Sequence, residues 1–162
     1  MHESQDQTKT VVEELDLLND KVFTKTQWEG RQTDWLLQWL VKSSNRASIS
    51  IGVTLSVSGA MISGKLIPHS VYFARLAEAF SAPFRQEGGH DADDLHDIIL
   101  GFNVTPEPGS PEEDDPFQFL HLENARTYFG TSSSIPGEAG TLWRGKISSV
   151  DGFTLGLISN EG

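Results

Sequence analysis

The residues best suited to chemistry lie in an acidic stretch past the middle of the chain. His90-Asp91 and His96-Asp97 place an imidazole beside a carboxylate twice, six residues apart, and a metal ion can use both types of ligand. The spacing matches neither the HExxH helix motif nor a calcium-binding loop. We therefore interpret these residues as part of a solvated acidic loop and predict no metal site.

Catalytic motifs are missing elsewhere in the sequence as well. The chain has no GxSxG elbow, no phosphate-binding P-loop and no GxGxxG motif after a strand. It has no cysteine, which excludes a thiol nucleophile, thiolate metal ligands and disulfides. Many of the carboxylates crowd into one loop, a poor place to hold two acids at a fixed separation. We predict that the protein is not an enzyme and needs no cofactor.

Length and charge narrow the class of protein further. A chain of 162 residues is long enough for one domain with a real core. The net charge of −11 argues against nucleic acid as a partner, because binding a polyanion depends on lysine and arginine. No run of about 18 apolar residues predicts a membrane span, and no secretory signal opens the sequence. These features predict a cytoplasmic protein that contacts no membrane.

The elements that would position any site are organised around the stretch from Ser48 to Phe80. From Ile49 to Val57 every second residue is isoleucine, valine or leucine, which predicts a half-buried strand. Gly59 suits a tight turn, and Met61 to Ile67 is predicted to return antiparallel. Gly64 indicates a bulge in this second strand.

Pro68 is predicted to end the second strand, because proline cannot donate a hydrogen bond to a neighbouring strand. Beyond it, apolar residues recur at the helical positions i, i+3, i+4 and i+7. The spacing predicts a short helix with Phe73, Leu76, Ala77 and Phe80 on one face.

Two helices are predicted before the first strand. A capping box at residues 10–13 begins a short amphipathic helix inside a flexible arm, residues 1–25. This helix either docks in a partner's groove or packs on its own domain. Its candidate partner contacts are Val11, Leu15, Leu18, Val22 and Phe23.

A second capping box, at residues 26–29, begins a helix whose apolar stripe is built from Trp35, Leu36, Trp39 and Leu40. The tryptophans could form a binding surface, but burial preferences favour the core. The same choice is open for Trp28, and we favour the core for Tyr72, Trp143 and Phe153 also.

An insertion at about 86–115 is predicted to be flexible and acidic. It has ten acidic residues between 86 and 115 and no lysine or arginine, with prolines and glycine in its later half. Its few large apolar residues can tie it to a core only as one short helix or strand. These residues are Leu95, Ile98, Ile99, Leu100 and Phe102.

The last third of the chain predicts more strands. Phe117 and Phe119 lie on one face of a strand and Leu120 and Leu122 on the other, so both faces are expected to be buried. Residues 142–150 and 153–159 flank Asp151-Gly152, a strong hairpin signal. The predicted fold class is therefore mainly β (α+β), a small strongly curved antiparallel barrel over residues 26–162 with an N-terminal helix and an inserted helix or acidic loop.

This layout resembles the Sm-like small barrel. The resemblance rests on the run VTLSVSGAMISGKL and on the later LWRGKI, where Arg144 and Gly145 correspond to the Arg-Gly of RNA-binding Sm proteins. Those proteins build a uridine pocket from an Asp and an Asn after the second-strand glycine, and here the offsets fall on Ser70 and Ala74. The resemblance thus implies a barrel with a relic of the pocket at Arg144 and Gly145. An Sm-like RNA-binding ring is the alternative function.

A closer resemblance is to the gas vesicle accessory protein U family. It is carried by ISIGVTLSVSGAMISGKLIPHSVYF, by FLHLENARTYF and by the ending LWRGKISSVDGFTLGLIS, about half of the chain. It implies a cytoplasmic, non-enzymatic protein, associated with gas vesicles, that assists vesicle formation or the clustering of finished vesicles. The implied partners are the vesicle shell or other accessory proteins.

Exposed strand edges add an expectation about self-association. A small barrel leaves strand edges unpaired, and pairing between copies is a natural way to cover them. We expect a homo-oligomer whose acidic insertions project from its rim.

Overall fold

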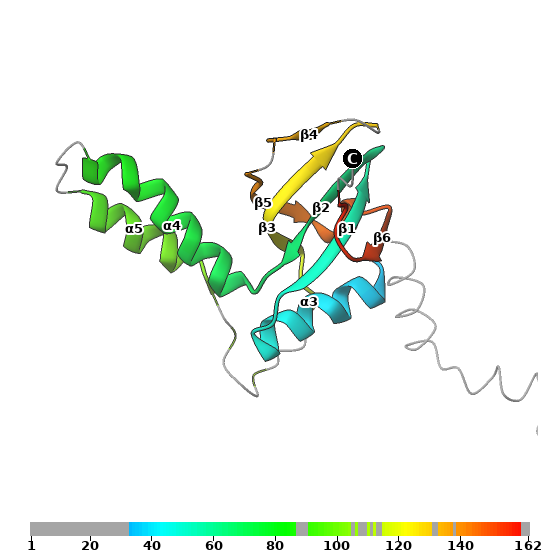
Figure 1. Cartoon of the computed structure of the whole chain (residues 1–162). Helices are drawn as coiled ribbons and strands as arrows, with labels where there is room; N and C mark the ends of the chain where they lie inside the picture. Colours follow the sequence, from blue (N-terminus) through cyan, green and yellow to red (C-terminus); the bar gives the residue numbers. More distant parts are fainter. Residues whose placement is uncertain are drawn as a thin grey trace, which may run out of the picture.

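The computed structural model describes residues 33–86, 91–104, 106, 110, 112, 115–130, 133–137 and 139–159. In these residues it has three helices and a six-stranded antiparallel sheet, an α+β fold (Figure 1). Helix α3 packs against the sheet, and helices α4 and α5 form a hairpin that projects away from it. The elements are α3 Trp35–Ala47, β1 Ile51–Val57, β2 Ala60–Leu66, α4 His69–Gln86, α5 Ala92–Gly101, β3 Phe119–Tyr128, β4 Ser134–Ile135, β5 Thr141–Lys146, the 3-10 helix η2 Ile147–Ser149 and β6 Gly152–Leu155.

Strands β1 and β2 form the predicted hairpin. Val53 and Leu55 are fully buried, as the alternation predicts, whereas Ile49 lies before the strand and is exposed. The turn residues Ser58 and Gly59 both have positive φ, 50° and 84°, which is the conformation of a two-residue hairpin turn. The local signals of this hairpin are thus confirmed.

Gly64 allows β2 and β3 to approach closely. The register between these strands shifts between Ser63 and Lys65, which confirms the predicted bulge. A Cβ atom on Gly64 would lie 3.0 Å from the Cα of Ala125, so any larger residue would push the two strands apart. Strand β2 then ends at Leu66, and α4 begins just after Pro68.

Helix α3 begins later than predicted. Asp34 is its N-cap, and the Asp34 carboxylate accepts hydrogen bonds from the backbone N–H groups of Leu36 (2.8 Å) and Leu37 (3.4 Å). The capping box predicted at residues 26–29 lies outside the described residues. The start of α3 was missed because Asp34 satisfies the first N–H groups without an acidic residue three positions later.

The prediction that the tryptophans of this helix are core residues is wrong. Trp35 and Trp39 are 66% and 58% exposed, and the buried stripe runs along Leu37, Leu40 and Val41. Both stripes have helical spacing, so the spacing alone cannot distinguish them. Trp28 lies outside the described residues.

The six strands form an open sheet, not a closed, strongly curved Sm-like barrel. The strand order is β4-β3-β2-β1-β6, with β5 also paired to β3, and no pairing joins β6 to β4 or β5 in the described part of the chain. The barrel prediction is therefore corrected. Strand β6 pairs only with residues 53–56 of β1 and ends the sheet on that side.

The predicted C-terminal hairpin around Asp151-Gly152 is also wrong. Strand β5 pairs with β3, whereas β6 pairs with β1, so the two segments do not pair with each other. The chain turns between them through η2, whose Ile147 is buried in the core. The Asp151 carboxylate accepts a hydrogen bond from the Ser58 N–H (2.8 Å), so Asp151 fixes the β1–β2 turn.

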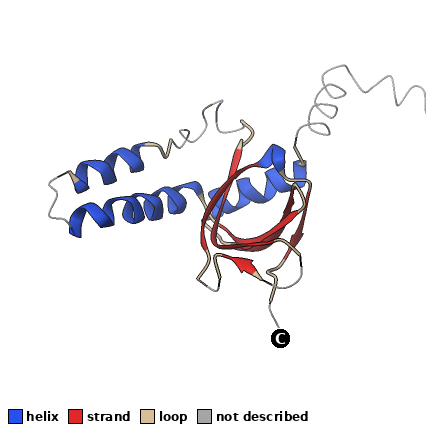
Figure 2. Cartoon of the chain, turned by 90° about the horizontal axis from the view of Figure 1, so that it is seen from above, coloured by secondary structure: helices blue, strands red, loops and turns tan. Residues whose placement is uncertain are grey.

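The core lies between α3 and the inner face of the sheet. Figure 2 shows α3 beside the strands and the α4–α5 hairpin extending away from them. Tyr72 is buried as predicted, and Trp143 and Phe153 pack partly buried against the core. The core residues are Leu37, Leu40, Val41, Val53, Leu55, Ile62, Leu66, Leu120, Leu122, Ala125 and Ile147.

Candidate functional site

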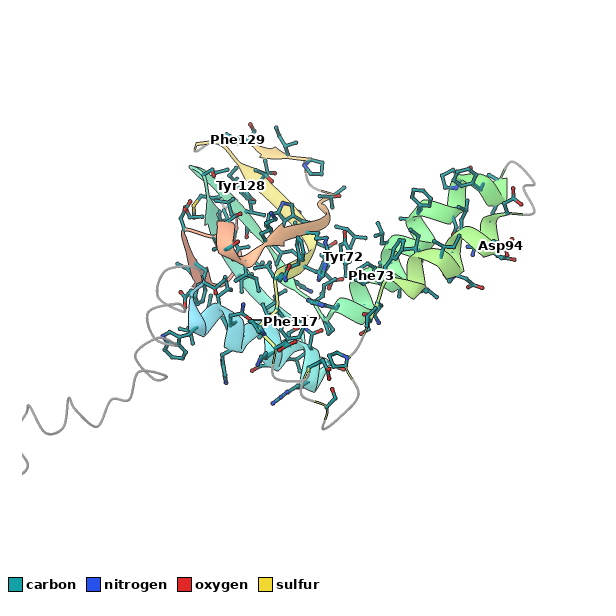
Figure 3. The ribbon with its side chains drawn as sticks, turned by 180° about the vertical axis from the view of Figure 1, so that it is seen from behind. Tyr72, Phe73, Asp94, Phe117, Tyr128 and Phe129 are labelled. Atoms are coloured by element: carbon teal, nitrogen blue, oxygen red, sulfur yellow. The ribbon has the colours of Figure 1, made fainter. Side chains whose placement is uncertain are left out.

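Two histidines meet where the first turns of α4 cross β3. On β3, the fully buried His121 lies between Leu120 and Leu122 and points to the face opposite the core, toward α4. The Tyr72 ring stacks on the His121 ring with centroids 4.0 Å apart, and the His69 ring meets it edge-on at 4.4 Å. Phe73 closes another side at 5.8 Å. Figure 3 shows Tyr72 and Phe73 where the hairpin joins the sheet.

Hydrogen-bond partners fix the protonation of both rings. The guanidinium of Arg144 can only donate, so its bond to Nε2 of His121 (2.7 Å) makes that nitrogen an acceptor and places the proton on Nδ1. The Phe119 carbonyl can only accept, so Nε2 of His69 donates to it (3.1 Å). The Nδ1 of His121 is buried without a hydrogen-bond partner in the described part of the chain.

Both histidines are held neutral. Burial, the neighbouring His69 and the charge of Arg144 lower the pKa of His121 to about 3. Burial also lowers the pKa of His69, and Arg144 adds to this effect while the bond to the Phe119 carbonyl opposes it. Neither histidine is therefore protonated near neutral pH. The two histidines pack as neutral rings, and at neutral pH neither can act as a general acid.

Arg144, one of the two predicted relics of an Sm-type pocket, lies over this cluster. Its guanidinium carbon is 4.0 Å from the centre of the Phe119 ring and 5.6 Å from that of Phe73. The second relic, Gly145, lies beneath the Trp143 indole, which occupies the space that a Cβ would need. Whether this pair is a relic of an RNA pocket stays a prediction. Ser70 and Ala74, the offset positions, lie on α4.

We expect Arg144→Gln to raise the pKa of His121 and to lower the free energy of unfolding by about 1–2 kcal/mol. The substitution removes a positive charge that disfavours His121 protonation, a cation–π contact and a hydrogen bond to a buried nitrogen. Histidine NMR titration and urea denaturation measure the two effects. The control is Arg85→Gln, whose guanidinium pairs with Glu78 far from the cluster. An unchanged His121 titration in Arg144→Gln would contradict the assignment.

An ion pair on the same face of β3 joins the sheet to α4. Glu123, 8% exposed, accepts a hydrogen bond from the Arg75 guanidinium. Burying a carboxylate is costly unless it is paired, so the pair fixes how α4 lies on the sheet. Together with the histidine cluster, it attaches the base of the α4–α5 hairpin to β3.

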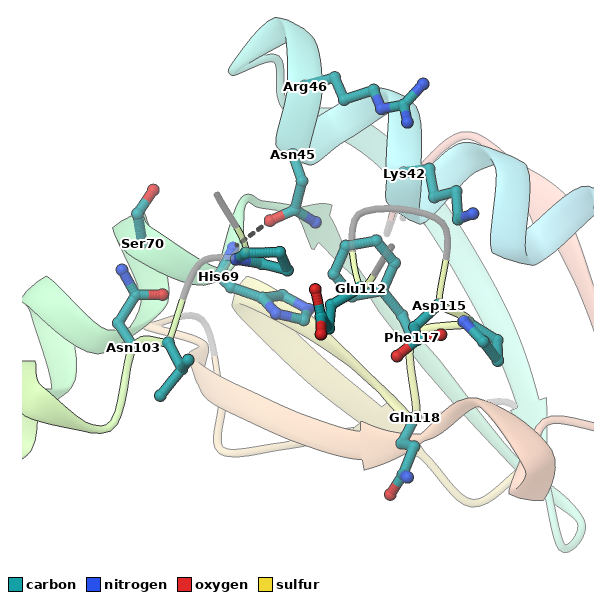
Figure 4. A pocket seen from close by; sticks show the side chains of 13 residues that line it. Lys42, Asn45, Arg46, His69, Ser70, Asn103, Glu112, Asp115, Phe117 and Gln118 are labelled. Atoms are coloured by element: carbon teal, nitrogen blue, oxygen red, sulfur yellow. Dashed lines mark hydrogen bonds between the residues drawn. The ribbon is translucent and has the colours of Figure 1, made fainter. Parts of the chain in front are cut away.

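A pocket of about 560 Å³ opens beside His69 (Figure 4). The His69 backbone N–H donates to the Asn45 carboxamide oxygen of α3 (2.9 Å), which binds the start of α4 to that helix. Lys42 and Arg46 of α3 and the carboxylates of Glu112 and Asp115 also line the pocket. Among the described residues that line it, no activated nucleophile lies beside a base, so this lining gives no mechanism for catalysis.

Of the two histidines weighed in the sequence as metal ligands, His96 lies in the described part of the chain. His96 lies 3.4 Å from Asp97 and 4.0 Å from Glu78, an exposed pairing. No group of three or more histidine, cysteine, aspartate or glutamate side chains is placed to hold a metal among the described residues. His90 lies outside the described residues.

The predicted partner contacts of the arm, residues 11–23, also lie outside the described residues, as does all of the arm at 1–25. Within the described residues, the sequence analysis missed two features. The first is the meeting of His69 with His121, which are far apart in the chain. The second is the apolar surface exposed on the α4–α5 hairpin, where Phe80, Ile98 and Phe102 are 47%, 55% and 59% exposed. The helical spacing of Phe73 to Phe80 was a signal for this surface.

No helix in the ranges that the structure describes is both long and apolar enough to cross a membrane. Comparison with known proteins gives one family match. The model of a family described as gas vesicle protein GvpU-like matches residues 34–158. Neither a curated protein nor a solved structure was found to match the chain.

Proposed function

The chain belongs to the GvpU-like gas vesicle protein family, and from this we propose that it is a non-enzymatic accessory protein that assists vesicle assembly or clustering. It acts by self-association and by contacts with the vesicle shell or other accessory proteins, in the cytoplasm at the vesicles. The observation that carries the proposal is the family match, which spans most of the chain. The family is one of structural and accessory proteins that are generally not enzymes.

Three features of the structure support a role in protein contacts. Trp35 and Trp39 are exposed on α3, and the α4–α5 hairpin has its own exposed apolar face. The outer edge of β6 is unpaired in the part of the chain that the structure describes, which leaves backbone groups for a strand of another copy. We also propose that the arm, residues 1–25, is a separate segment joined to the domain at 26–162, and that its Val11 to Phe23 segment contacts partners.

The alternative of an Sm-like RNA-binding ring gains no support from the site. The Arg144 guanidinium is engaged by Phe119 and His121. Negligible binding to oligo-uridine at low salt is the expected result, since a protein of net charge −11 repels a polyanion.

Two experiments test the proposed function. Deleting the gene for this protein from a vesicle-forming host is expected to lower the yield of vesicles or to disperse their clusters. Electron microscopy measures both. Light scattering on the full chain is expected to give a mass well above one 17.8 kDa subunit. Loss of that mass on deletion of residues 1–24 would place the arm in the contact. A monomeric full chain, with yield and clustering unchanged in the deleted host, would disprove the proposal.

A further inference from the structure

One face of the α4–α5 hairpin is polar. Arg85 of α4 pairs with Glu78 (2.8 Å) and, across to α5, with Asp93 (3.6 Å). His96 of α5 lies 4.0 Å from Glu78 on the same side. These contacts bridge the two helices along a single face and fix which way each helix is turned.

The opposite face is apolar and open. Helical spacing places Phe80 and Phe84 of α4, Ile98 of α5 and the α5 C-cap residue Phe102 on the side away from the ion pairs. The Phe80 and Phe84 rings are 6.1 Å apart, and all four side chains are more than 40% exposed. Because the hairpin projects from the sheet, none of the described strands covers this face (Figure 1).

Acidic residues border the apolar face. Asp94 lies one turn before Ile98 on α5, and Asp91 lies about one turn before Asp94; both are exposed. Figure 3 shows Asp94 at the end of the hairpin away from the sheet, with Phe73 at the other end. The two arginines of the hairpin face other carboxylates, since Arg75 pairs with Glu123 and Arg85 with Glu78.

The charge of the hairpin selects among possible occupants. Its described residues have two arginines and five carboxylates, a net charge of −3 with histidine neutral. A second hairpin would bring the same negative charge to the contact. The arm segment at 11–23 has four carboxylates and one lysine, so it is acidic too. A basic partner is the complementary one. The residues counted for the hairpin are Arg75, Arg85, Glu78, Asp91, Asp93, Asp94 and Asp97.

We propose that this face binds an amphipathic helix of another protein whose apolar stripe is flanked by lysine or arginine. The stripe packs on Phe80, Phe84, Ile98 and Phe102, and its basic flanks meet Asp91 and Asp94. Along α5 the face runs from Asp94 to Phe102, about 12 Å, which matches about two turns of a bound helix. The proposal rests on the proposed function in that the bound helix belongs to a vesicle protein.

The test uses the full-length protein and two synthetic fluorescent helical peptides. One has a leucine stripe flanked by lysines, and the other has the same stripe flanked by glutamates. Fluorescence anisotropy is expected to show binding of the lysine peptide and at least tenfold weaker binding of the glutamate peptide. Ile98→Ser is expected to weaken binding of the lysine peptide at least tenfold, and Asp94→Lys several-fold. The control Phe129→Ser, at an exposed apolar residue just after β3, is expected to keep the wild-type affinity.

Several results would overturn the proposal. Equal affinity for both peptides would refute the charge argument, and wild-type affinity in Ile98→Ser would refute the site. Tighter peptide binding after deletion of residues 1–24 would identify the arm as the occupant. A lower solution mass for Ile98→Ser would identify a second copy. Asp94→Lys changes only an exposed charge, so it tests the site even if Ile98→Ser alters folding. Vesicle clustering is measured separately, so failure here does not imply failure of the proposed function.

Discussion

Acidification from pH 6.5 to pH 4.5 is expected to lower the free energy of unfolding by about 2 kcal/mol through His121 alone. The pKa of His121 in the fold is lowered to about 3, whereas in the unfolded chain it returns to its ordinary value near 6.5. Between these two values the unfolded state binds a proton that the folded state does not, so stability falls as the pH falls. One such proton changes stability by about 1.4 kcal/mol per pH unit. His69, whose pKa is also lowered, adds to the effect in the same direction.

Urea denaturation at pH 6.5, 5.5 and 4.5 measures this dependence. Carboxylates that are paired in a fold generally also lose favourable interactions in acid, so the informative quantity is the difference between variants. His121→Gln is expected to have a shallower slope by about one proton, whatever its stability at pH 6.5. An identical slope in wild type and His121→Gln would show that His121 is not held neutral by the fold.

The second large effect is expected for Gly140→Ala, which should lower the free energy of unfolding by about 3 kcal/mol. Gly140 has a φ of +64°, a conformation that residues with a Cβ rarely adopt. An added Cβ would lie 2.7 Å from both the Cα and the carbonyl carbon of Asn124, which are backbone atoms and cannot rotate away. Asn124 itself has a positive φ at the bulge in β3, and Gly140 lies close against its backbone.

Thermal melting gives the comparison. At about 2–4 °C per kcal/mol for a domain of this size, Gly140→Ala is expected to melt about 6–12 °C below the wild type. Gly137→Ala is the matched control, because a Cβ there meets no atom within 4 Å and its φ is not positive. Equal melting temperatures for Gly140→Ala and Gly137→Ala would contradict the close approach of Gly140 to β3.

Features encoded by neighbouring residues could be predicted from the sequence. The alternation of Val53 and Leu55, the turn at Gly59 and the bulge at Gly64 each depend on a few adjacent positions, and all three were confirmed. The helix after Pro68 was confirmed for the same reason. Local sterics and pleating decide these features, whatever the rest of the chain does.

Features that depend on distant partners were missed. Asp151-Gly152 has the sequence of a hairpin turn, but the Asp151 carboxylate binds the Ser58 N–H, 93 residues earlier. The tryptophans of α3 have helical spacing, but a rotated stripe beginning at Leu37 fits the sheet. Likewise, the site around His121 depends on how α4 crosses β3, which no local pattern encodes.

The pairing of β1 with β6 has a consequence for synthesis of the protein. Thr54 pairs with Thr154, 100 residues later, so the edge of β1 finds its native neighbour only after nearly the whole domain has been translated. At translation rates of about 5–20 residues per second, this edge of β1 stays unpaired for about 5–20 s during synthesis. During that time its row of backbone groups can pair with other nascent chains. The protein should therefore benefit from chaperones that shield strand edges, and slowing translation between β2 and β6 should increase aggregation.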